Sequence, residues 1–381
     1  MVSSNKRSIM RIGIDARMYG PKQAGLGRYV QKLLENLAEI DSENEYVVFL
    51  KKDNFDLFET KNSKFKKVLA DIHWYGKDEQ LLFLKIIKKE KVDLMHFPHW
   101  NVPLFYRAPF VVTIHDLILV HYPNRRASTL NPVLYFLKYV FFRIILWHTI
   151  FESKKIITIS EFSKKDLVKT LKVKPHKIVV TYEAPLEEQV GGGENVLEKY
   201  NITKPFVMYV GNAFPHKNLE MLVKSWQFFI EKYSKNYQLV LVGKENYFYK
   251  RLKKEVENYN DKNLSESIKI IGFVPDKLLV GLYKKAELYV FPSLYEGFGV
   301  PPLEAMQYGV PVVSSNKSCM PEILEDGANY FDPENYQEIA KVIYKNLIDQ
   351  REIKKLKENS KVILKKYSWK KMAKETLEVY K

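Results

Sequence analysis

Two glutamates around a glycine-spaced turn carry the strongest chemical signal in this sequence. Glu296 and Glu304 have seven residues between them, and Gly297 and Gly299 lie in that interval. The turn follows an apolar strand pattern and leads into a predicted helix, whose first backbone N–H groups and positive end attract anions. The two carboxylates can accept hydrogen bonds from hydroxyl groups on either side. This combination fits a phosphate joined to a polyhydroxyl group, which is the composition of a sugar nucleotide.

A lysine supplies a second element for binding an anion. The predicted strand over 206–211 ends at Gly211, and the loop after it brings Lys217 to the start of a new helix. A lysine at that position offers a compact positive charge for a diphosphate, although a lysine on a solvated face remains an alternative. Two carboxylates also fit the acid–base pair of a glycosidase. The neighbouring anion-binding elements disfavour that reading, because a hydrolase of neutral sugars has no use for a phosphate pocket.

Glycines also follow the first predicted strand, Met10–Asp15. Gly25 and Gly27, with Arg28 and Tyr29 after them, stand where a helix begins, and glycine lets a ligand approach the backbone closely. The segment is not G-x-G-x-x-G, and no acidic residue ends a second strand about 20 residues later. An ordinary tight turn therefore remains open, and Arg28 could meet an anion or lie on the surface.

Histidines end two further strands of the first half. His115 and Asp116 follow an apolar run, where the histidine could donate a hydrogen bond to a substrate hydroxyl or phosphate and Asp116 could orient it. His96 and His99 end the preceding strand. A zinc site would need a third ligand at a known spacing, and none is obvious, so we predict no metal. Ser160 has the position of a helix N-cap.

Short apolar strands alternate with helical patterns along the whole chain, which predicts α/β units with parallel sheets and helices on both faces. The predicted strands are Met10–Asp15, Tyr46–Leu50, Leu94–Phe97, Phe110–His115, Lys155–Ser160, Lys177–Tyr182, Phe206–Gly211, Gln238–Val242, Ile268–Ile271, Leu288–Phe291 and Val310–Ser314. Helices are clearest at Gly27–Ile40, Gln80–Lys89 and from Tyr336 to Lys381. A glycine- and proline-containing stretch at 184–204 interrupts the alternation and predicts a linker. Two such halves imply a cleft between them, with ligands at the carboxyl ends of the strands.

Composition limits the function classes. The 381 residues carry a net charge of +16, which suits nucleic acid, an anionic membrane or phosphorylated substrates. The lysines are spread along the chain without a nucleic-acid-binding signature, which disfavours a nucleic-acid partner. Cys319 is the only cysteine and predicts a small core residue in a reducing cytoplasm. The first ten residues have no apolar signal segment.

Residues 131–151 form an apolar run interrupted by Lys138, Arg143 and His148. Charges in its middle disfavour a membrane span, and we find no standard span elsewhere. Two alternatives stay open for this helix. It could lie on an anionic membrane surface, which would make the protein peripheral on the inner face of the cytoplasmic membrane, or it could pack within the first domain.

Taken together, these residues resemble the retaining glycosyltransferases of the GT-B fold, family 4, also called group 1. The segment Glu296-Gly-Phe-Gly-Val-Pro-Pro-Leu-Glu304 is similar to that family's E-x7-E motif. Other motifs fall in the family's order, from about Arg11 to Leu377: Gly25-Leu-Gly27-Arg28-Tyr29, His115-Asp116, Ser160-Glu-Phe-Ser-Lys and Met320-Pro-Glu-Ile.

The resemblance implies two Rossmann-like domains, an acceptor domain at 1–186 and a nucleotide-sugar domain at 205–364, with a linker at 187–204 and a C-terminal helix at 365–381 returning to the first domain. It implies no metal and no other cofactor. Glu304 would bind the ribose, Glu296 the donor sugar, Lys217 the diphosphate and the amides of 297–299 the phosphate or sugar. His115 would contact the donor sugar or the reacting centre. The remaining assignments are Gly25, Gly27, Asn212 and Phe298 for the donor and Arg28, Tyr29, His99 and Asp116 for the acceptor.

One residue departs from the family pattern. Many members have arginine where this chain has Asn212, which weakens the diphosphate site unless His216 or Arg28 compensates. The variant resembles a branch with mannosyl- and rhamnosyl-type transferases of cell-surface polysaccharide assembly. We therefore expect transfer of a hexosyl unit from a GDP- or UDP-sugar to a glycan or lipid-linked acceptor. The alternatives are a sugar-nucleotide 2-epimerase of the same fold and a non-catalytic nucleic-acid binder.

Overall fold

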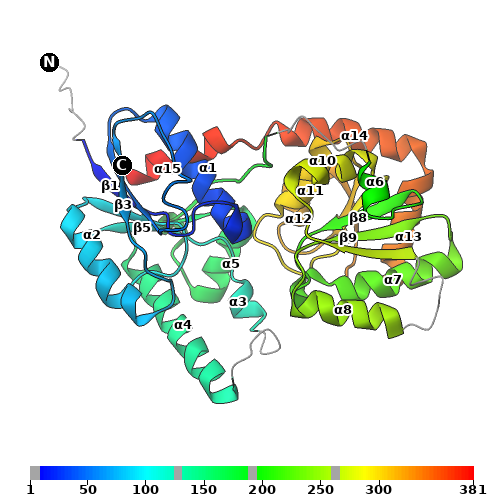
Figure 1. Ribbon diagram of the computed structural model, residues 1–381, viewed down its shortest axis with the longest axis horizontal. Coiled ribbons are helices and arrows are strands. Elements are labelled where there is room, and N and C mark those ends of the chain that lie inside the picture. The colour runs from blue at the N-terminus through cyan, green and yellow to red at the C-terminus, as the bar shows by residue number, and fades with distance from the viewer. Residues whose placement is uncertain (1–8, 124–130, 188–194, 259–266) are drawn as a thin grey trace. The chain divides into compact units, whose positions relative to one another are not determined.

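The computed structural model describes residues 9–123, 131–187, 195–258 and 267–381 (Figure 1). The chain divides into two compact units, each with its own sheet. The first comprises the described residues of Met1–Leu117, Ser128–Glu183 and Ser368–Lys381, and the second those of Ile118–Ala127 and Ala184–Tyr367. The glycines at 191–193 of the predicted linker lie outside the described residues.

The first unit contains a seven-stranded parallel sheet in the order β3-β2-β1-β4-β5-β6-β7. Its central strands are buried on both faces, as short runs of branched apolar residues predict for a parallel sheet. The strands are β1 Arg11–Asp15, β2 Glu45–Leu50, β3 Phe65–Leu69, β4 Leu94–Phe97, β5 Phe110–Thr113, β6 Lys155–Thr158 and β7 Ile178–Val180. The helices include α1 Ala24–Ile40, α2 Leu84–Glu90, α4 Pro132–Glu152, α5 Glu161–Leu171 and α15 Trp369–Tyr380.

The second unit contains a six-stranded parallel sheet in the order β10-β9-β8-β11-β12-β13. Its strands are β8 Phe206–Val210, β9 Gln238–Val242, β10 Ile268–Gly272, β11 Leu288–Phe291, β12 Val312–Ser315 and β13 Ala328–Phe331. Its helices include α3 Ile118–His121, α6 Val196–Lys199, α7 Leu219–Lys232, α8 Tyr247–Asn258, α10 Asp276–Lys285, α11 Val300–Gln307, α12 Met320–Leu324, α13 Tyr336–Ile348 and α14 Gln350–Leu364.

The second sheet has the strand order 3-2-1-4-5-6 of a Rossmann-like fold, and the first has the same order with a seventh strand, β7, added at its edge, so the predicted fold class is confirmed. The order reverses between β1 and β4 in the first unit and between β8 and β11 in the second. Open α/β sheets bind ligands outside the carboxyl ends of the strands at such a reversal. These two places are therefore where the functional residues should gather.

Two strands were missed, and both lie at a sheet edge. β3 reads Phe-Lys-Lys-Val-Leu and is half exposed, and β13 contains an asparagine. Edge strands lack the continuous apolar pattern by which buried strands are recognised. The first helix was placed too late, because α1 begins at Ala24 rather than at Gly27. Cys319 is fully buried, and burial raises the pKa of its thiol, as predicted for a core residue.

The carboxyl-terminal helix α15 belongs to the first unit and packs against α1 (Figure 1). Its Tyr380 hydroxyl lies 2.6 Å from Nδ1 of His96 on β4, and Nε2 of His96 lies 2.9 Å from the Thr113 hydroxyl on β5. His96 is fully buried, and burial followed by the charge of His115 lowers its pKa to about 3. Both nitrogens of a neutral buried imidazole are thus satisfied, one of them by the last helix.

Replacing Tyr380 by phenylalanine should lower the free energy of unfolding by about 1–3 kcal/mol, because one buried nitrogen of His96 loses its partner. Urea denaturation of Tyr380→Phe and the wild type measures this difference. The matched control is Tyr247→Phe, since Tyr247 is 62% exposed and its hydroxyl can reach water. Equal losses in both variants would contradict the assigned role of Tyr380.

Helix α4 is the one helix of the described residues that is long and apolar enough to cross a membrane, with 21 residues and a mean hydropathy of 1.4. Length and composition alone are weak evidence, because core helices of soluble proteins pass the same test. Only its last third is packed in the unit, through Ile145, Leu146 and Ile150. Its amino-terminal part projects from the first unit in Figure 1. Nine of its side chains are large, apolar and exposed: Val133, Leu134, Phe136, Leu137, Val140, Phe141, Ile144, Trp147 and Phe151.

Candidate active site

In the second unit, Lys217 and Glu296 meet at the reversal of the sheet. The Lys217 Nζ lies 2.5 Å from Glu296 Oε1, and both side chains are largely buried. Lys217 ends the turn after β8, and Glu296 follows β11, so the pair joins the two strands where the order reverses. Asn218, in the left-handed region, donates from Nδ2 to the carbonyl oxygens of Pro292 and Pro333 and fixes this turn.

Glu304 lies in the second turn of α11 and is 8% exposed. Tyr283 donates a hydrogen bond to Glu304 Oε2 over 3.3 Å. The Tyr283 ring lies 6.1 Å from the Tyr289 ring on β11, which lies 6.3 Å from the ring of Phe291. Lys217 Nζ, the partner of Glu296, lies 5.7 Å from the centroid of that Phe291 ring. The predicted pair of glutamates is therefore brought to one region of the second unit.

The turn before α11 requires glycine at position 299. Gly299 has φ +85°, and an added Cβ would lie 2.3 Å from Met320 Cε, so only glycine fits without displacement. Pro301, in the first turn, is favourable for the start of a helix. Phe298 is 2% exposed and packs edge-to-face on Tyr367, so its ring belongs to the core and its backbone alone remains for a donor contact.

Neither Asn212 nor His216 supplies the positive charge that the family's arginine would. The Asn212 side chain accepts a hydrogen bond from the Phe214 N–H and thus shapes the turn. Burial, followed by the charge of Lys217, lowers the pKa of His216 to about 4, so this imidazole is neutral near pH 7. His216 therefore adds no positive charge to this turn near pH 7, and its contact with a diphosphate stays a prediction.

In the first unit, His115 is held by acceptors on both ring nitrogens. Nε2 lies 3.0 Å from the Pro98 carbonyl oxygen, and Nδ1 lies 3.3 Å from Glu183 Oε1. Burial alone lowers the pKa of His115, but the hydrogen bond and charge of Glu183 outweigh it, with smaller contributions from Pro98 and Asp116, so the pKa is raised. The main partner of His115 is thus Glu183, not Asp116 as expected. Glu183 follows the strand β7, and that strand-end position was the available signal.

Glu183→Gln should lower the pKa of His115, because burial remains while the negative charge is lost. In the wild type the raised pKa stabilises the fold below about pH 6.5, and this contribution is lost as the pH rises through the folded value. NMR titration of the ring and denaturation between pH 5 and 8 measure both effects. Glu39→Gln, at a pair that is largely exposed, serves as the control and should leave the titration unchanged.

Three predicted residues of the first glycine-containing turn have different environments. An added Cβ at Gly25 would meet nothing within 4 Å, so a ligand can approach there, whereas at Gly27 it would lie 2.0 Å from the Gly20 carbonyl oxygen. Tyr29 is fully buried, bonds to Thr113 and packs against the His115 ring. The predicted contact of Tyr29 with an acceptor is therefore wrong. Arg28 lies in the first turns of α1 and belongs to the first unit.

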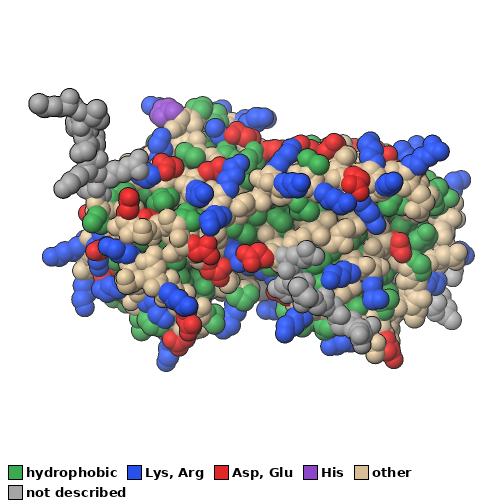
Figure 2. Space-filling model, turned by 90° about the horizontal axis from the view of Figure 1, so that it is seen from above, with side chains coloured by type: hydrophobic (Ala, Val, Ile, Leu, Met, Phe, Trp, Pro, Cys, Tyr) green, Lys and Arg blue, Asp and Glu red, His purple; other side chains and the backbone are tan. Residues whose placement is uncertain are grey.

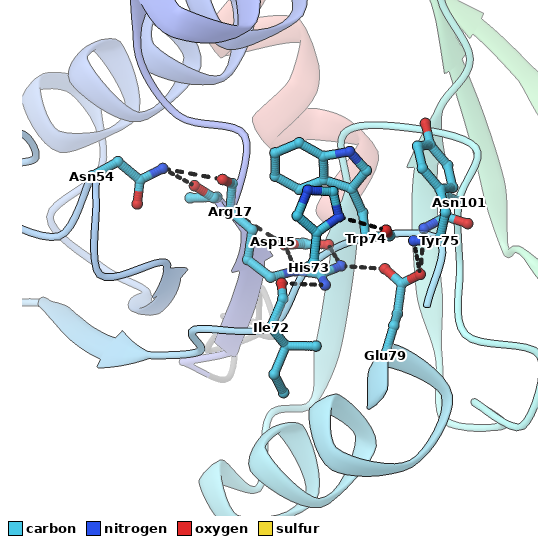
Figure 3. Close-up of polar contacts among 10 residues, drawn as sticks. Asp15, Arg17, Asn54, Ile72, His73, Trp74, Tyr75, Glu79 and Asn101 are labelled. Atoms are coloured by element: carbon cyan, nitrogen blue, oxygen red, sulfur yellow. Dashed lines mark hydrogen bonds and ion pairs between the residues drawn. The ribbon is translucent and has the colours of Figure 1, made fainter. Parts of the chain in front are cut away.

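A second cluster occupies the reversal of the first unit's sheet (Figure 3). Arg17, two residues beyond β1, pairs with Asp15 over 2.7 Å and with Glu79 over 2.6 Å. Glu79 in turn accepts a hydrogen bond from Asn101, which follows β4. The predicted acceptor residue His99 lines a pocket together with Asp15, Arg17 and Asn101 of this cluster. Sequence analysis missed the other members, although Asp15 was recognised as the end of a strand.

Comparison with known proteins identifies the family. The model for glycosyl transferases group 1 matches residues 194–362, and that for Glycosyltransferase Family 4 matches residues 24–184. The O-antigen chain mannosyltransferase B of Escherichia coli is 30% identical over 77% of this chain and 76% of its own length. The chain belongs to this family of glycosyltransferases. The O-antigen chain mannosyltransferase RfbU of Salmonella typhimurium is 27% identical over 83% of this chain and 85% of its own.

A solved structure shares the fold of this chain. Anabaena Alr3699/HepE in complex with UDP-glucose superposes with a TM-score of 0.72 at 16% identity, covering 97% of this glycosyltransferase and 99% of that chain. Family membership makes the protein a retaining enzyme, as the resemblance to the family implied. Within the described residues, no group of three or more His, Cys, Asp or Glu side chains is arranged to hold a metal ion.

Figure 2 shows Lys and Arg side chains scattered over one face of this glycosyltransferase, with Asp and Glu side chains between them. A protein that binds nucleic acid through its charge usually gathers these side chains into a stripe or patch. The distribution on this face and the family assignment together favour an enzyme over a nucleic-acid binder.

Proposed function

We propose that this glycosyltransferase moves a hexosyl unit, with mannosyl favoured, from a GDP- or UDP-sugar to a hydroxyl of a glycan or lipid-linked acceptor during synthesis of a cell-surface polysaccharide. The observation that carries the proposal is the pairing of Lys217 with Glu296 at the sheet reversal of the second unit, with Glu304 nearby. The mannosyl preference follows from the two O-antigen relatives.

Each side chain has a distinct task in this proposal. When the donor binds, its diphosphate replaces Glu296 as the ion-pair partner of Lys217. The released carboxylate of Glu296 then accepts hydrogen bonds from hydroxyls of the donor sugar. Glu304 accepts from the two ribose hydroxyls. As the bond between the anomeric carbon and the diphosphate oxygen breaks, Lys217 offsets the negative charge that develops on the leaving group.

Retention of configuration requires the acceptor oxygen to bond to the face from which the diphosphate departs. We assign the acceptor proton to the departing phosphate oxygen, since none of the described carboxylates is needed as a base in this route. The proposal uses neither a metal nor another cofactor, because Lys217 and the backbone N–H groups at the start of α11 stabilise the negative charge that a metal ion would otherwise stabilise.

A donor screen tests the proposal. A ligand that binds the native state raises the melting temperature, so UDP, GDP and ADP are compared by thermal shift. Release of nucleotide from UDP-glucose, UDP-galactose and GDP-mannose is then measured in the presence of an extract that contains several kinds of glycan and lipid-linked acceptor. We expect one nucleotide to stabilise the protein and its sugar to be transferred with retention. Binding of none of the three, with no nucleotide release, would refute the proposal.

We further propose that α4 holds the enzyme on an anionic membrane, where lipid-linked acceptors reside. Its nine exposed large apolar side chains form a contiguous stretch of surface that water disfavours. Lys138 and Arg143 add positive charge, and residues 131–151 include no acidic side chain. A basic, aromatic helix of this kind lies in the interface between headgroups and acyl chains.

The membrane proposal predicts that the protein sediments with vesicles containing about one-third phosphatidylserine at low salt. Leu137→Glu should reduce the bound fraction several-fold, because a charge replaces an exposed apolar side chain that would enter the lipid. The control is Phe273→Glu, at an aromatic side chain of the second unit with 67% exposure. Equal sedimentation of both variants would leave α4 without a membrane role.

A further inference from the structure

The first unit contains a pocket whose place in the fold matches that of the donor residues in the second unit. It is lined by Asp15, Arg17, Trp74, Pro98, His99 and Asn101, with apolar side chains of α1 on one side. Asp15 ends β1, and the last three follow β4, so the pocket lies at the reversal of this sheet. The pocket as a whole has room for about one water molecule, so it can take one hydroxyl group of a ligand whose ring lies outside it.

The charged groups of this pocket are arranged around Arg17. All three guanidinium nitrogens donate to neighbours: Nε to Asp15, Nη1 to the Ile72 carbonyl oxygen, and Nη2 to Asp15 and Glu79. The side chain of Arg17 is 2% exposed, and Phe83 covers its face. Arg17 is thus held between two carboxylates (Figure 3). Lys51 is a second cation beside the pocket, with its Nζ 4.9 Å from the centroid of the Trp74 ring.

The same pocket offers acceptor atoms without a partner. Asn101 is 4% exposed, and its Nδ2 donates to Glu79 Oε2 over 2.6 Å, which fixes the amide so that Oδ1 is an acceptor. Among the described residues, Asn101 Oδ1 and His99 Nδ1 are buried and have no hydrogen-bond partner. Burial and the charge of His115 lower the pKa of His99 to about 3, so this ring is neutral. A buried acceptor atom requires a donor, and a phosphate dianion has none to give.

Trp74 supplies an aromatic wall. Lys51 Nζ lies 4.9 Å from the centroid of its ring, and the His73 ring lies 4.5 Å away. The indole is half-buried at the rim, and the adjacent Tyr75 adopts φ +67° while its N–H donates to Glu79 Oε2. The segment is therefore anchored by the same carboxylate that fixes Asn101. A flat aromatic surface beside hydroxyl-accepting groups matches the two sides of a pyranose ring, which has an apolar face and polar edges.

We propose that this pocket binds the terminal sugar of an uncharged glycan acceptor, with one hydroxyl donating to Asn101 Oδ1 and the ring against Trp74. This inference rests on the proposed function and narrows it, because the acceptor is then recognised through a neutral sugar and not through a phosphate at this position. His99 Nδ1 accepts a hydrogen bond from a second hydroxyl of the same sugar or from a bound water.

Saturation-transfer NMR on the full chain without donor tests the inference, with methyl α-mannopyranoside, methyl α-glucopyranoside and methyl α-galactopyranoside as neutral probes and mannose 6-phosphate and inorganic phosphate as charged ones. We expect at least one neutral glycoside to bind in the millimolar range. Both phosphates should bind about fivefold more weakly or not at all. Tighter binding of either phosphate in the same pocket would overturn the inference.

Two variants locate the binding. Trp74→Ala and Asn101→Ala should each weaken the bound glycoside about fivefold or more, and in turnover they should raise the acceptor KM more than they lower kcat. Because Asn101→Ala also removes a partner of Glu79 and can impair folding, the half-buried Trp74 provides the second test. Phe105→Ala, at a 61% exposed aromatic of the same unit, is the matched control. Unchanged binding in both pocket variants would overturn the inference.

The outcomes separate this inference from the proposed function. If the enzyme transfers sugar from a donor while no neutral glycoside binds this pocket, the pocket assignment fails and the function stands. If neutral glycosides bind there while no nucleotide sugar is cleaved, the pocket remains a sugar site and the proposed function fails.

Discussion

Replacing Lys217 by alanine should lower kcat about 100- to 1,000-fold. Lys217 is the cation at the reversal of the second unit's sheet, where Asn212 and the neutral His216 add no charge. Removing one group that stabilises charge in a transition state typically costs about 3–4 kcal/mol. The family arginine is absent at position 212, so no neighbouring side chain of this turn takes over the task. Single-turnover rates at saturating donor measure the loss.

The arginine variant and a surface control make this result specific. Lys217→Arg should recover part of kcat, because the charge remains although its shape and reach change. Loss of the partner also leaves the buried Glu296 uncompensated, so the rates must be compared at a temperature where thermal unfolding shows every variant folded. Lys250→Ala, at a 68% exposed side chain, should retain the wild-type rate. A Lys217→Ala rate within threefold of the wild type would contradict the assigned role.

The sequence predicted the residues that meet through fold topology. Lys217 and Glu296 are separated by 79 positions, but each follows a strand that borders a sheet reversal. Alternating strands and helices determine that order, and the order determines which strand ends are neighbours. The two strands were therefore sufficient to predict that Lys217 and Glu296 lie at one site, whereas the ion pair between them was not predicted.

The sequence could not predict contacts that depend on how loops cover the sheet. Glu79 reaches Arg17 from a π-helical turn at Glu79–Phe83, and the sequence pattern there indicated only an ordinary helix. Glu183 reaches His115 from the end of β7, while the adjacent Asp116 was the more obvious partner by sequence distance. Side-chain direction at a strand end follows from local backbone geometry, which periodicity does not describe.

Tyr29 shows the opposite error. Its position after two glycines, at the start of a predicted helix, indicated contact with a ligand, yet Tyr29 is buried in the core. In a helix each residue advances the direction by about 100°, and the glycine pattern does not indicate which side of the helix faces the sheet. The consequence is a tyrosine that supports the His115 ring and does not contact an acceptor.

Replacing each of the two glutamates should impair a different function of the enzyme. Glu304→Ala should weaken binding of the free nucleotide roughly 10- to 100-fold, because hydrogen bonds from two ribose hydroxyls to a carboxylate are lost. Glu296→Ala should leave nucleotide binding within about threefold of the wild type, or strengthen it, because Lys217 is released from its 2.5 Å ion pair and becomes available to the diphosphate. Its kcat should fall, since the donor sugar loses the group that orients it.

Calorimetric titration with the nucleotide alone, followed by turnover with the complete donor, separates these effects. Glu304 accepts a hydrogen bond from Tyr283, so Glu304→Gln provides a variant of the same size that tests charge without emptying the site. Glu245→Ala, at a 64% exposed carboxylate of the same unit, is the control. If Glu296→Ala instead lost the nucleotide and Glu304→Ala kept it, the ribose would have to lie at the end of β11 and the sugar beside α11. The orientation of the donor would then be the reverse of the one proposed, even though the same residues would still form the site.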